Sequence, residues 1–343
     1  MTQENIVVIG ASAGGVATIS NLLNQLPHDL PAAILVVIHL SPQSPGLLPE
    51  IMQKHSKLKV IDPKDGDCIR SSHVYIAPPN KHMVIHRDRK IQLIVGPRIN
   101  RSRPAIDPLF RSAALTYGNS VIGIILSGLL DDGILGLHTV KNYGGTTIVQ
   151  DPNEAPYPDM PLNALQKVNI DYCLTVKEIA PTIIQIISNP HPTEQIQTST
   201  DSIDNKTTQA EAAIDENLIH SVEELGKVGS PSFYTCPDCH GTLWEVSNNH
   251  VLHFRCRVGH VYGTEDLAVS LSENVENALW AALRTLEESA NISQKLAEKN
   301  SQNPVTVKIA KRFKEREIET RRHAAIIKKI LLKKTSSKQV EKR

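Results

Sequence analysis

The chain has 343 residues, with 37 Lys and Arg against 36 Asp and Glu, and 40% of the residues are hydrophobic. This length excludes a single small module and this composition excludes a disordered chain, so we expect roughly two domains with buried cores. Five cysteines, three of them within 21 positions, exclude a secreted disulfide framework. Because the N-terminus lacks a basic leader and the apolar runs are too short to span a membrane, the sequence predicts a cytoplasmic protein without membrane insertion.

Residues 1–187 alternate short, β-branched apolar runs with longer amphipathic stretches. Examples of the short runs are NIVVIG at 5–10, AAILVVIHL at 32–40 and VIGIILSG at 121–128. This alternation is typical of an α/β domain built on a doubly wound, mostly parallel sheet. The run at 71–95 leaves no room for helices between its strands, which predicts an inserted antiparallel hairpin beside the sheet.

The composition changes after this first domain. Residues 188–232 are polar and poor in aromatic side chains, so we expect a flexible linker. Residues 233–264 form a compact block rich in cysteine and histidine, and 265–334 has the apolar periodicity of a helical pair, followed by a basic tail at 335–343. The 14 Lys and Arg against 4 Asp and Glu in 308–343 are typical of a solvated helix, so we do not expect nucleic acid binding.

The first apolar strand leads into Gly10-Ala11-Ser12-Ala13-Gly14 and then into an amphipathic helix. This is the strand, turn and helix context of a G-x-S-x-G nucleophile elbow, in which small residues flank a serine at a sharp turn. Free backbone N–H groups at the helix N-terminus, including that of Ala13, can bind the oxyanion that forms when a carbonyl is attacked. The same segment also matches a degraded G-x-G-x-x-G phosphate-binding turn, with Ser12 in place of the middle glycine.

A nucleophilic serine needs a base and an orienting carboxylate, and the ends of nearby strands supply both. His39 follows the second strand and lies beside Ser12 if the first two strands are neighbours. A nucleotide site would favour an acid at that position, and none is present there. The strand at 121–128 is followed by Asp131 and Asp132; one of them can face His39 while the other caps the next helix.

Six segments of the first domain together resemble the CheB-type protein-glutamate methylesterases of bacterial chemotaxis. They are VVIGASAGG, VVIHLSP, VYIAPPNKHM, RSRPAIDPLFRSAA, ILSGLLDDGILGL and DMPLNAL. The resemblance implies that Ser12 is the nucleophile, His39 the base and Asp132, the second acid of the pair, the orienting carboxylate. It also implies that the backbone N–H of Leu129 binds the oxyanion and that Met160 lines the substrate pocket.

By the same resemblance, we expect an enzyme that hydrolyses the γ-methyl esters of glutamates in chemoreceptor cytoplasmic helices and can deamidate glutamines there. Such an enzyme needs no cofactor for catalysis, and its further partners would be a chemotaxis methyltransferase or other signalling-array proteins. Many family members carry an N-terminal receiver domain, whereas here the catalytic strand begins at about residue 5, so we expect no control by a receiver in cis. The loop GLLDDG at 128–133 is bulkier and more acidic than the Gly-Met-Gly-Asn-Asp-Gly run that is common in the family.

The block at 233–264 contains two residue pairs on two turns, with the spacing of zinc ligands. The pairs are Cys236 with Cys239 and Cys256 with His260, and the alternatives to His260 on spacing alone are His240 and His253. A Cys3His set predicts a structural Zn²⁺ in a zinc ribbon, with no open position for catalysis. The other cysteines, Cys68 and Cys173, are expected to be packed thiols.

The main alternative to an enzyme is a non-catalytic scaffold or binding module, in which the zinc ribbon and the basic helices dock a partner. A nucleotide-binding protein is a third hypothesis, and it predicts stabilisation by a dinucleotide. The joint presence of Ser12, His39 and Asp132 favours the enzyme.

Overall fold

The computed structural model describes residues 5–189, 221–248, 251–302 and 305–340, with side chains described up to residue 332. Its internal contacts group the chain into two compact units, 1–267 and 268–343. The first unit contains the α/β domain and the block with the three clustered cysteines, and the second contains most of the two long C-terminal helices.

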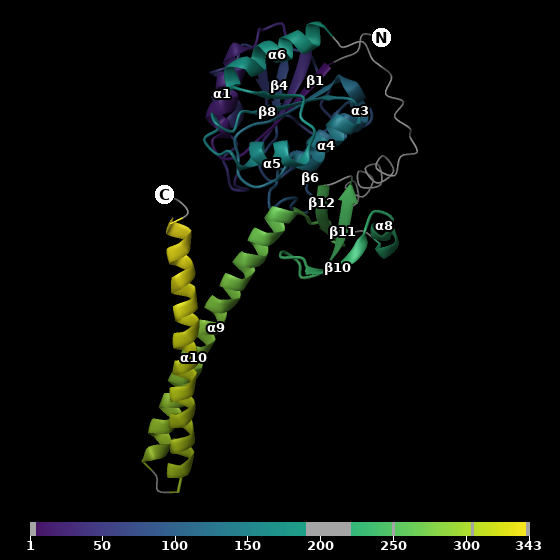
Figure 1. Ribbon diagram of the computed structural model, residues 1–343. Coiled ribbons are helices and arrows are strands. Elements are labelled where there is room, and N and C mark those ends of the chain that lie inside the picture. Colours follow the sequence, from purple (N-terminus) through teal and green to yellow (C-terminus); the bar gives the residue numbers. More distant parts are fainter. Residues whose placement is uncertain (1–4, 190–220, 249–250, 303–304, 341–343) are drawn as a thin grey trace. The chain divides into compact units, whose positions relative to one another are not determined.

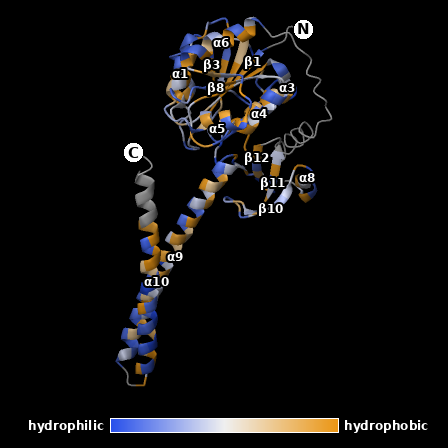
Figure 2. Ribbon diagram, viewed as in Figure 1, coloured by the Kyte–Doolittle hydropathy of each residue, from blue (hydrophilic) through white to orange (hydrophobic). Residues whose placement is uncertain are grey.

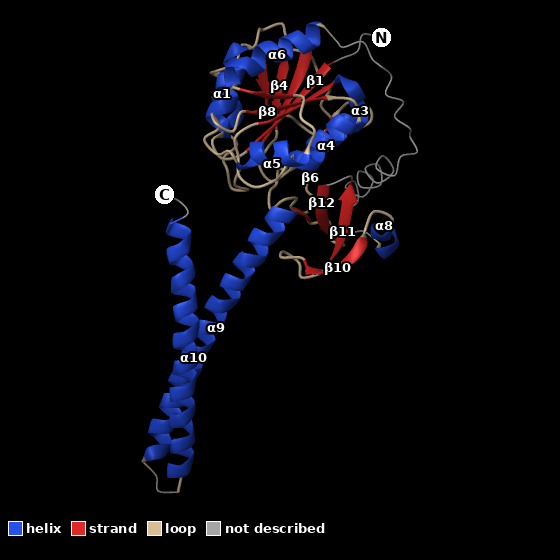
Figure 3. Cartoon of the chain, in the orientation of Figure 1, coloured by secondary structure: helices blue, strands red, loops and turns tan. Residues whose placement is uncertain are grey.

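Seven strands of the first unit form one sheet in the order β3-β4-β2-β1-β7-β8-β9. Figures 1 and 3 show strands of this sheet, among them β1, β4 and β8, between the helices of the α/β domain. Every adjacent pair in this sheet is parallel. The strands are β1 Asn5–Ala11, β2 Ala32–Ile38, β3 Lys59–Ile61, β4 His73–Ile76, β7 Val121–Ile125, β8 Thr146–Gln150 and β9 Tyr172–Leu174. On one side of β1 the chain places β2, then β3 at the edge of the sheet, and then β4 between them; on the other side it adds β7, β8 and β9 outward. The predicted doubly wound α/β fold is therefore confirmed.

Helices cover both faces of this sheet (Figure 1). One face packs against α1 Gly15–Gln25, α2 Leu48–Gln53 and α6 Val176–Ser188, and the other against α3 Ile106–Tyr117, α4 Ile134–Asn142 and α5 Asp159–Lys167. A 3-10 turn at Gly118–Ser120 connects α3 to β7. Because side chains alternate along a strand, successive apolar residues of β1 serve opposite faces, and the strand reads as one continuous apolar run.

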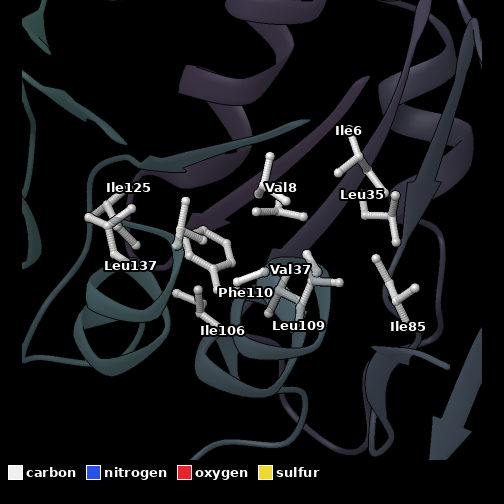
Figure 4. Packing of buried hydrophobic residues seen from close by; sticks show 14 of the residues in the cluster. Ile6, Val8, Leu35, Val37, Ile85, Ile106, Leu109, Phe110, Ile125 and Leu137 are labelled. Carbon is white, nitrogen blue, oxygen red and sulfur yellow. The ribbon is translucent and has the colours of Figure 1, made fainter. Parts of the chain in front are cut away.

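The packing on the α3 side is shown in Figure 4. Val8 of β1 and Val37 of β2 meet Phe110 and Leu109 of α3 there, and all four side chains are fully buried. The predicted antiparallel hairpin is also confirmed: β5 His82–Ile85 pairs with β6 Ile91–Ile94 in a separate two-stranded sheet.

Residues 221–263, which we call the cysteine module, form a four-stranded antiparallel sheet preceded by a short helix. The elements are α8 Val222–Gly226, β10 Ser230–Thr235, β11 Thr242–Asn248, β12 Val251–Cys256 and β13 Val261–Gly263. Val251 at the start of β12 is only 4% exposed and belongs to the same apolar cluster as α3, α4 and α5. The module therefore contributes a side chain to the core of the α/β domain.

The predicted linker at 188–232 differs from the structure at both ends. Helix α6 continues to Ser188, and the last part of the segment folds into α8 and the start of β10. The physical reason for α8 is a capping box, in which Glu224 N–H donates to Ser221 Oγ and Ser221 N–H donates to the Glu224 carboxylate. Residues 190–220 lie outside the described part of the chain.

The C-terminal region contains the predicted helical pair, α9 Thr264–Ser301 and α10 Val307–Val340. Buried side chains such as Leu283 of α9 and Ala324 and Leu331 of α10 pack together, and hydrophilic residues alternate with hydrophobic ones along both helices (Figure 2). Helix α10 continues into the segment predicted as a basic tail at 335–343. None of the helices in the described part of the chain is both long and apolar enough to cross a bilayer.

Truncating Phe110 tests the packing of α3 against the sheet. We expect Phe110→Ala to lower the free energy of unfolding by about 3–5 kcal/mol, because it leaves a cavity in a fully buried cluster. Urea denaturation measures the loss, and Phe233→Ala is the matched control because the Phe233 side chain is fully exposed. Equal midpoints for the two variants would contradict this account of the core.

Candidate active site

Ser12 lies in a tight turn between the end of β1 at Ala11 and the start of α1 at Gly15. The turn closes through a hydrogen bond from Gly15 N–H to Ser12 O at 3.0 Å, with Gly14 in the left-handed region at φ +76°. A Cβ at Gly14 would lie 2.9 Å from Ser127 Oγ, so glycine is required there for space as well as for conformation. The predicted elbow is therefore present, and it sets Ser12 at the N-terminus of α1.

His39 follows β2 at the same edge of the sheet. The parallel register pairs Ala11 with Ile38, and His39 N–H donates to Ala11 O at 3.2 Å. Ser12 and His39 are thus the first residues beyond two neighbouring strands, as the sequence predicted. The His39 side chain is 18% exposed, so it is reachable from solvent while most of it is packed.

Asp132, rather than Asp131, faces His39. Its Oδ2 lies 2.6 Å from His39 Nε2, and its side chain is 2% exposed. The carboxylate also accepts hydrogen bonds from Ile106 N–H at 2.7 Å and from the Asn100 amide at 2.9 Å. Asp131 instead lies 3.3 Å from Lys167 Nζ.

The surroundings of Asp132 favour its charged form. Burial alone would raise the pKa of this carboxyl, but the hydrogen bonds from His39, Ile106 and Asn100 outweigh burial and hold the pKa below its ordinary value. An ionised Asp132 can accept a hydrogen bond from a protonated His39 Nε2, and this hydrogen bond fixes the tautomer of the imidazole ring. Nδ1 is then the unprotonated nitrogen of the imidazole ring.

The loop after β7 lies directly against the serine. Ser12 N–H donates to Ser127 O at 3.0 Å, and Ser127 Oγ donates to Ala13 O at 2.9 Å. A Cβ at Gly128 would lie 1.9 Å from Met160 Sδ and 2.9 Å from Ser12 Cβ, so only glycine fits between these two side chains. Met160 is fully buried in the first turn of α5, beneath the loop.

The two backbone N–H groups predicted to bind an oxyanion belong to the residues that follow Ser12 and Gly128, which lie against each other. Ala13 follows Ser12 in the elbow, and Leu129 follows Gly128 in the loop, with its side chain 45% exposed. Leu130 adopts φ +65°, a left-handed conformation that turns the chain toward the two acids. The loop geometry is therefore held at three points: Ser127, Gly128 and the buried Met160.

Two polar residues of the site were not assigned a role from the sequence. Asn100 and Asp107 are 4% and 1% exposed, and the Asn100 amide donates to Asp107 Oδ2 at 2.8 Å. Asp107 also accepts a hydrogen bond from Gly136 N–H at 2.7 Å. Burial, together with the nearby Asp132 charge, raises the pKa of Asp107 well above its ordinary value. Asp107 lies in the motif RSRPAIDPLF, but a motif does not show which atom a side chain contacts.

The four residues predicted as zinc ligands converge in the cysteine module. Cys236 Sγ and Cys256 Sγ lie 3.6 and 3.5 Å from His260 Nδ1, Cys239 Sγ lies 3.6 Å from Cys256 Sγ, and all four ligand atoms fall within 4.8 Å of one another. A tetrahedral zinc site with Zn–S about 2.3 Å and Zn–N about 2.0 Å has ligand separations of about 3.5–3.8 Å. The donor set and its spacing therefore fit a Zn²⁺ ion.

The remaining candidates of the module are not part of this group. In the described part of the chain, His240 and His253 belong to no cluster of potential metal ligands. Cys68 and Cys173 are exposed, so the expectation that they are packed thiols was wrong. Cys173 lies on β9, one of the two edge strands of the sheet, which has a neighbouring strand on one side only.

The comparisons with known proteins agree with this geometry. The profile of the CheB methylesterase family matches residues 7–183. A relative from Leptospira interrogans is 37% identical over 183 residues, which are 53% of this chain and 95% of that protein. Relatives from Methanosarcina acetivorans and Photorhabdus laumondii, both named protein-glutamate methylesterase/protein-glutamine glutaminase, are 36% and 33% identical, over 54% and 55% of both chains respectively.

A solved structure shares the fold of the first domain. The crystal structure of the Thermotoga maritima CheB methylesterase catalytic domain superposes with a TM-score of 0.52 and 33% identity, covering 53% of this chain and 98% of that one. The matched part contains Ser12, His39 and Asp132 and ends before the cysteine module. The chain belongs to the CheB methylesterase family of carboxylic ester hydrolases.

Proposed function

We propose that this chain is a serine-dependent protein-glutamate methylesterase that acts on glutamate γ-methyl esters of chemoreceptors. The observation that carries the proposal is the 2.6 Å pair of His39 and Asp132 at the strand edge that also holds the Ser12 elbow. The names of the relatives support the substrate class, and the additional name protein-glutamine glutaminase supports deamidation of glutamines as a second activity.

In the proposed mechanism, His39 Nδ1 takes the proton of Ser12 Oγ as the oxygen attacks the ester carbonyl. The backbone N–H groups of Ala13 and Leu129 bind the oxyanion of the tetrahedral intermediate. The His39 imidazolium then donates its proton to the methoxy oxygen, so that methanol leaves and an acyl-enzyme remains. A water molecule, deprotonated by His39, hydrolyses the acyl-enzyme and restores Ser12, while Asp132 stabilises the imidazolium in both half-reactions.

The proposed substrates are the methylated cytoplasmic helices of chemoreceptors, and a cytoplasmic location follows from that choice. The reacting group in these helices is the γ-methyl ester of a glutamate or the side-chain amide of a glutamine. The proposed hydrolysis uses only protein groups and water, so no cofactor takes part in catalysis. A chemotaxis methyltransferase or other signalling-array proteins are the further partners we propose.

For the cysteine module we propose a structural zinc ribbon. Cys236, Cys239, Cys256 and His260 would hold the ion, and Tyr262, whose hydroxyl donates to Asp238 Oδ2 at 2.5 Å, packs 3.7 Å from Cys236 Sγ. With four protein ligands, the ion has no open position for a substrate and contributes folding free energy.

Methanol release from chemoreceptor membranes with labelled methyl groups tests the activity. We expect the full-length protein to release methanol and Ser12→Ala to be slower by at least about 10³-fold, because the nucleophile is lost. If neither protein releases methanol, labelling of Ser12 by a serine-reactive probe separates a wrong substrate from a non-catalytic module. Release by Ser12→Ala at the normal rate would contradict the mechanism.

Asn substitutions at the two adjacent acids test which one serves His39. We expect Asp132→Asn to lower kcat by about 10⁴-fold with little change in KM, because the imidazole loses its orienting charge. Asp131→Asn is the comparison, since Asp131 contacts Lys167 instead, and its kcat should fall less than about tenfold. The reverse order of effects would reassign the carboxylate.

Metal analysis and thermal unfolding test the zinc ribbon. We expect about one equivalent of zinc in protein purified without chelator, and loss of zinc with a lower melting temperature in Cys239→Ser. Cys68→Ser is the matched control, because Cys68 is exposed and outside the ligand group. Zinc-free protein with an unchanged melting temperature in both variants would refute the assignment.

A further inference from the structure

We propose that Asn100 is a positioning residue for Asp132, and that strand β13 of the cysteine module holds Asn100 in place. The module would then be a working part of the esterase site and not an appended domain. This inference rests on the proposed function, since it concerns the carboxylate that orients His39. It is carried by a continuous set of hydrogen bonds between the module and the site.

The first link is between β13 and the segment before α3. Asn100 N–H donates to Val261 O at 2.8 Å, and Ile99 forms a parallel bridge with Val261. Ile99 and Val261 also pack with Ala105 in a small apolar cluster of their own. Backbone pairing and apolar packing thus fix the position of residues 99–100 against the module.

The second link is the side-chain amide of Asn100, which is 4% exposed. Its Oδ1 accepts the N–H of Gly263 at 2.9 Å, and its Nδ2 donates to Asp132 Oδ1 at 2.9 Å and to Asp107 Oδ2 at 2.8 Å. A flipped amide would point its oxygen at two carboxyl groups and its NH2 at a backbone N–H. The Gly263 N–H and the two carboxyl groups therefore fix which way the amide faces, and the amide in turn positions Asp132 Oδ1.

The backbone conformation of the turn at residues 99–102 is unfavourable on its own. Asn100 and Arg101 both have positive φ, +47° and +63°, in a turn closed by hydrogen bonds between Ile99 and Ser102 at 3.2 and 2.9 Å. Consecutive left-handed residues other than glycine are unfavourable and persist only where the surroundings hold them. The pairing of Asn100 with β13 is part of what holds this turn.

Gly263 packs so closely against Asp131 that a substitution there can test the proposal. A Cβ at Gly263 would lie 2.3 Å from Asp131 Oδ2, so a larger residue there forces either β13 or the Asp131 side chain, next to Asp132, to move. Just beyond it, Glu265 accepts a hydrogen bond from Asn163 at 2.6 Å, and Asn163 also donates to Leu130 O at 2.9 Å. Segment 261–265 therefore contacts both Asn100 and the loop after β7.

If this chain of contacts is broken, Asp132 keeps its bond to His39 only in a fraction of the molecules. The effect falls on proton transfer by His39, so kcat and the reactivity of Ser12 should decrease. Substrate binding does not require the amide of Asn100, so KM should change little.

The experiment compares full-length Gly263→Ala with Gly226→Ala, the matched control, because a Cβ at Gly226 meets nothing within 4 Å. Three quantities are measured: the rate at which a small fluorophosphonate labels Ser12, kcat and KM for methanol release, and hydrogen exchange of the segment 99–107. We expect Gly263→Ala to label at least about tenfold more slowly, with lower kcat, nearly unchanged KM and faster exchange. Gly226→Ala should match the wild type in all three.

Asn100→Asp is the second variant, because it keeps the acceptor for Gly263 and replaces the donor that faces Asp132 and Asp107. It should lower the labelling rate and kcat while retaining zinc and leaving KM nearly unchanged, a split between kcat and KM that a merely structural role would not produce. The thermal midpoint should fall as well, because a third carboxyl group enters the buried cluster of Asp132 and Asp107. Normal labelling by both Gly263→Ala and Asn100→Asp overturns the proposal, as does unchanged exchange of 99–107 in Gly263→Ala. If the wild type is not labelled at all, the proposed function fails, and the exchange result still decides whether β13 holds Asn100.

Discussion

Strand β1 pairs in parallel with β2 on one side and with β7 on the other, and the functional site depends on this double pairing. Parallel strands end at the same edge, so the residues that follow β1, β2 and β7 meet even though more than a hundred positions separate the first from the last. Ser12, His39 and the loop with Asp132 follow these three strands. Only the loop after β7 has to turn, at Leu130, to bring Asp132 to His39.

The charge on Asp132 is the second requirement, and it conflicts with the burial that the sheet edge imposes. A carboxylate that is 2% exposed stays ionised here because it accepts bonds from an imidazole, a backbone N–H and an amide. Its neighbour Asp107 lacks the imidazole and has a raised pKa. Two buried carboxyl groups that share one amide donor thus have pKa values shifted in opposite directions because of their other partners.

Much of this could be predicted from the sequence, and the part that could not has a common cause. The alternating apolar runs predicted the parallel sheet, and the logic of strand ends brought Ser12 and His39 together. The choice between Asp131 and Asp132 came only from the resemblance to a family, because adjacent residues differ in side-chain direction and not in spacing. The role of Asn100 depends on a contact with Gly263, 163 positions away, and no local pattern encodes such a contact. The capping box of α8, by contrast, is encoded locally, by Ser221 and Glu224 at a three-residue spacing.

Val251 has a consequence for how the protein is made. This side chain completes an apolar cluster whose other members come from the first 168 residues, so the nascent α/β domain leaves the ribosome with one position of its core unfilled. The cluster closes only after β12 has been synthesised, through a contact of very long sequence separation, and such contacts form slowly. The domain that carries the nucleophile therefore reaches its final packing late in synthesis, together with the cysteine-rich strands and not before them.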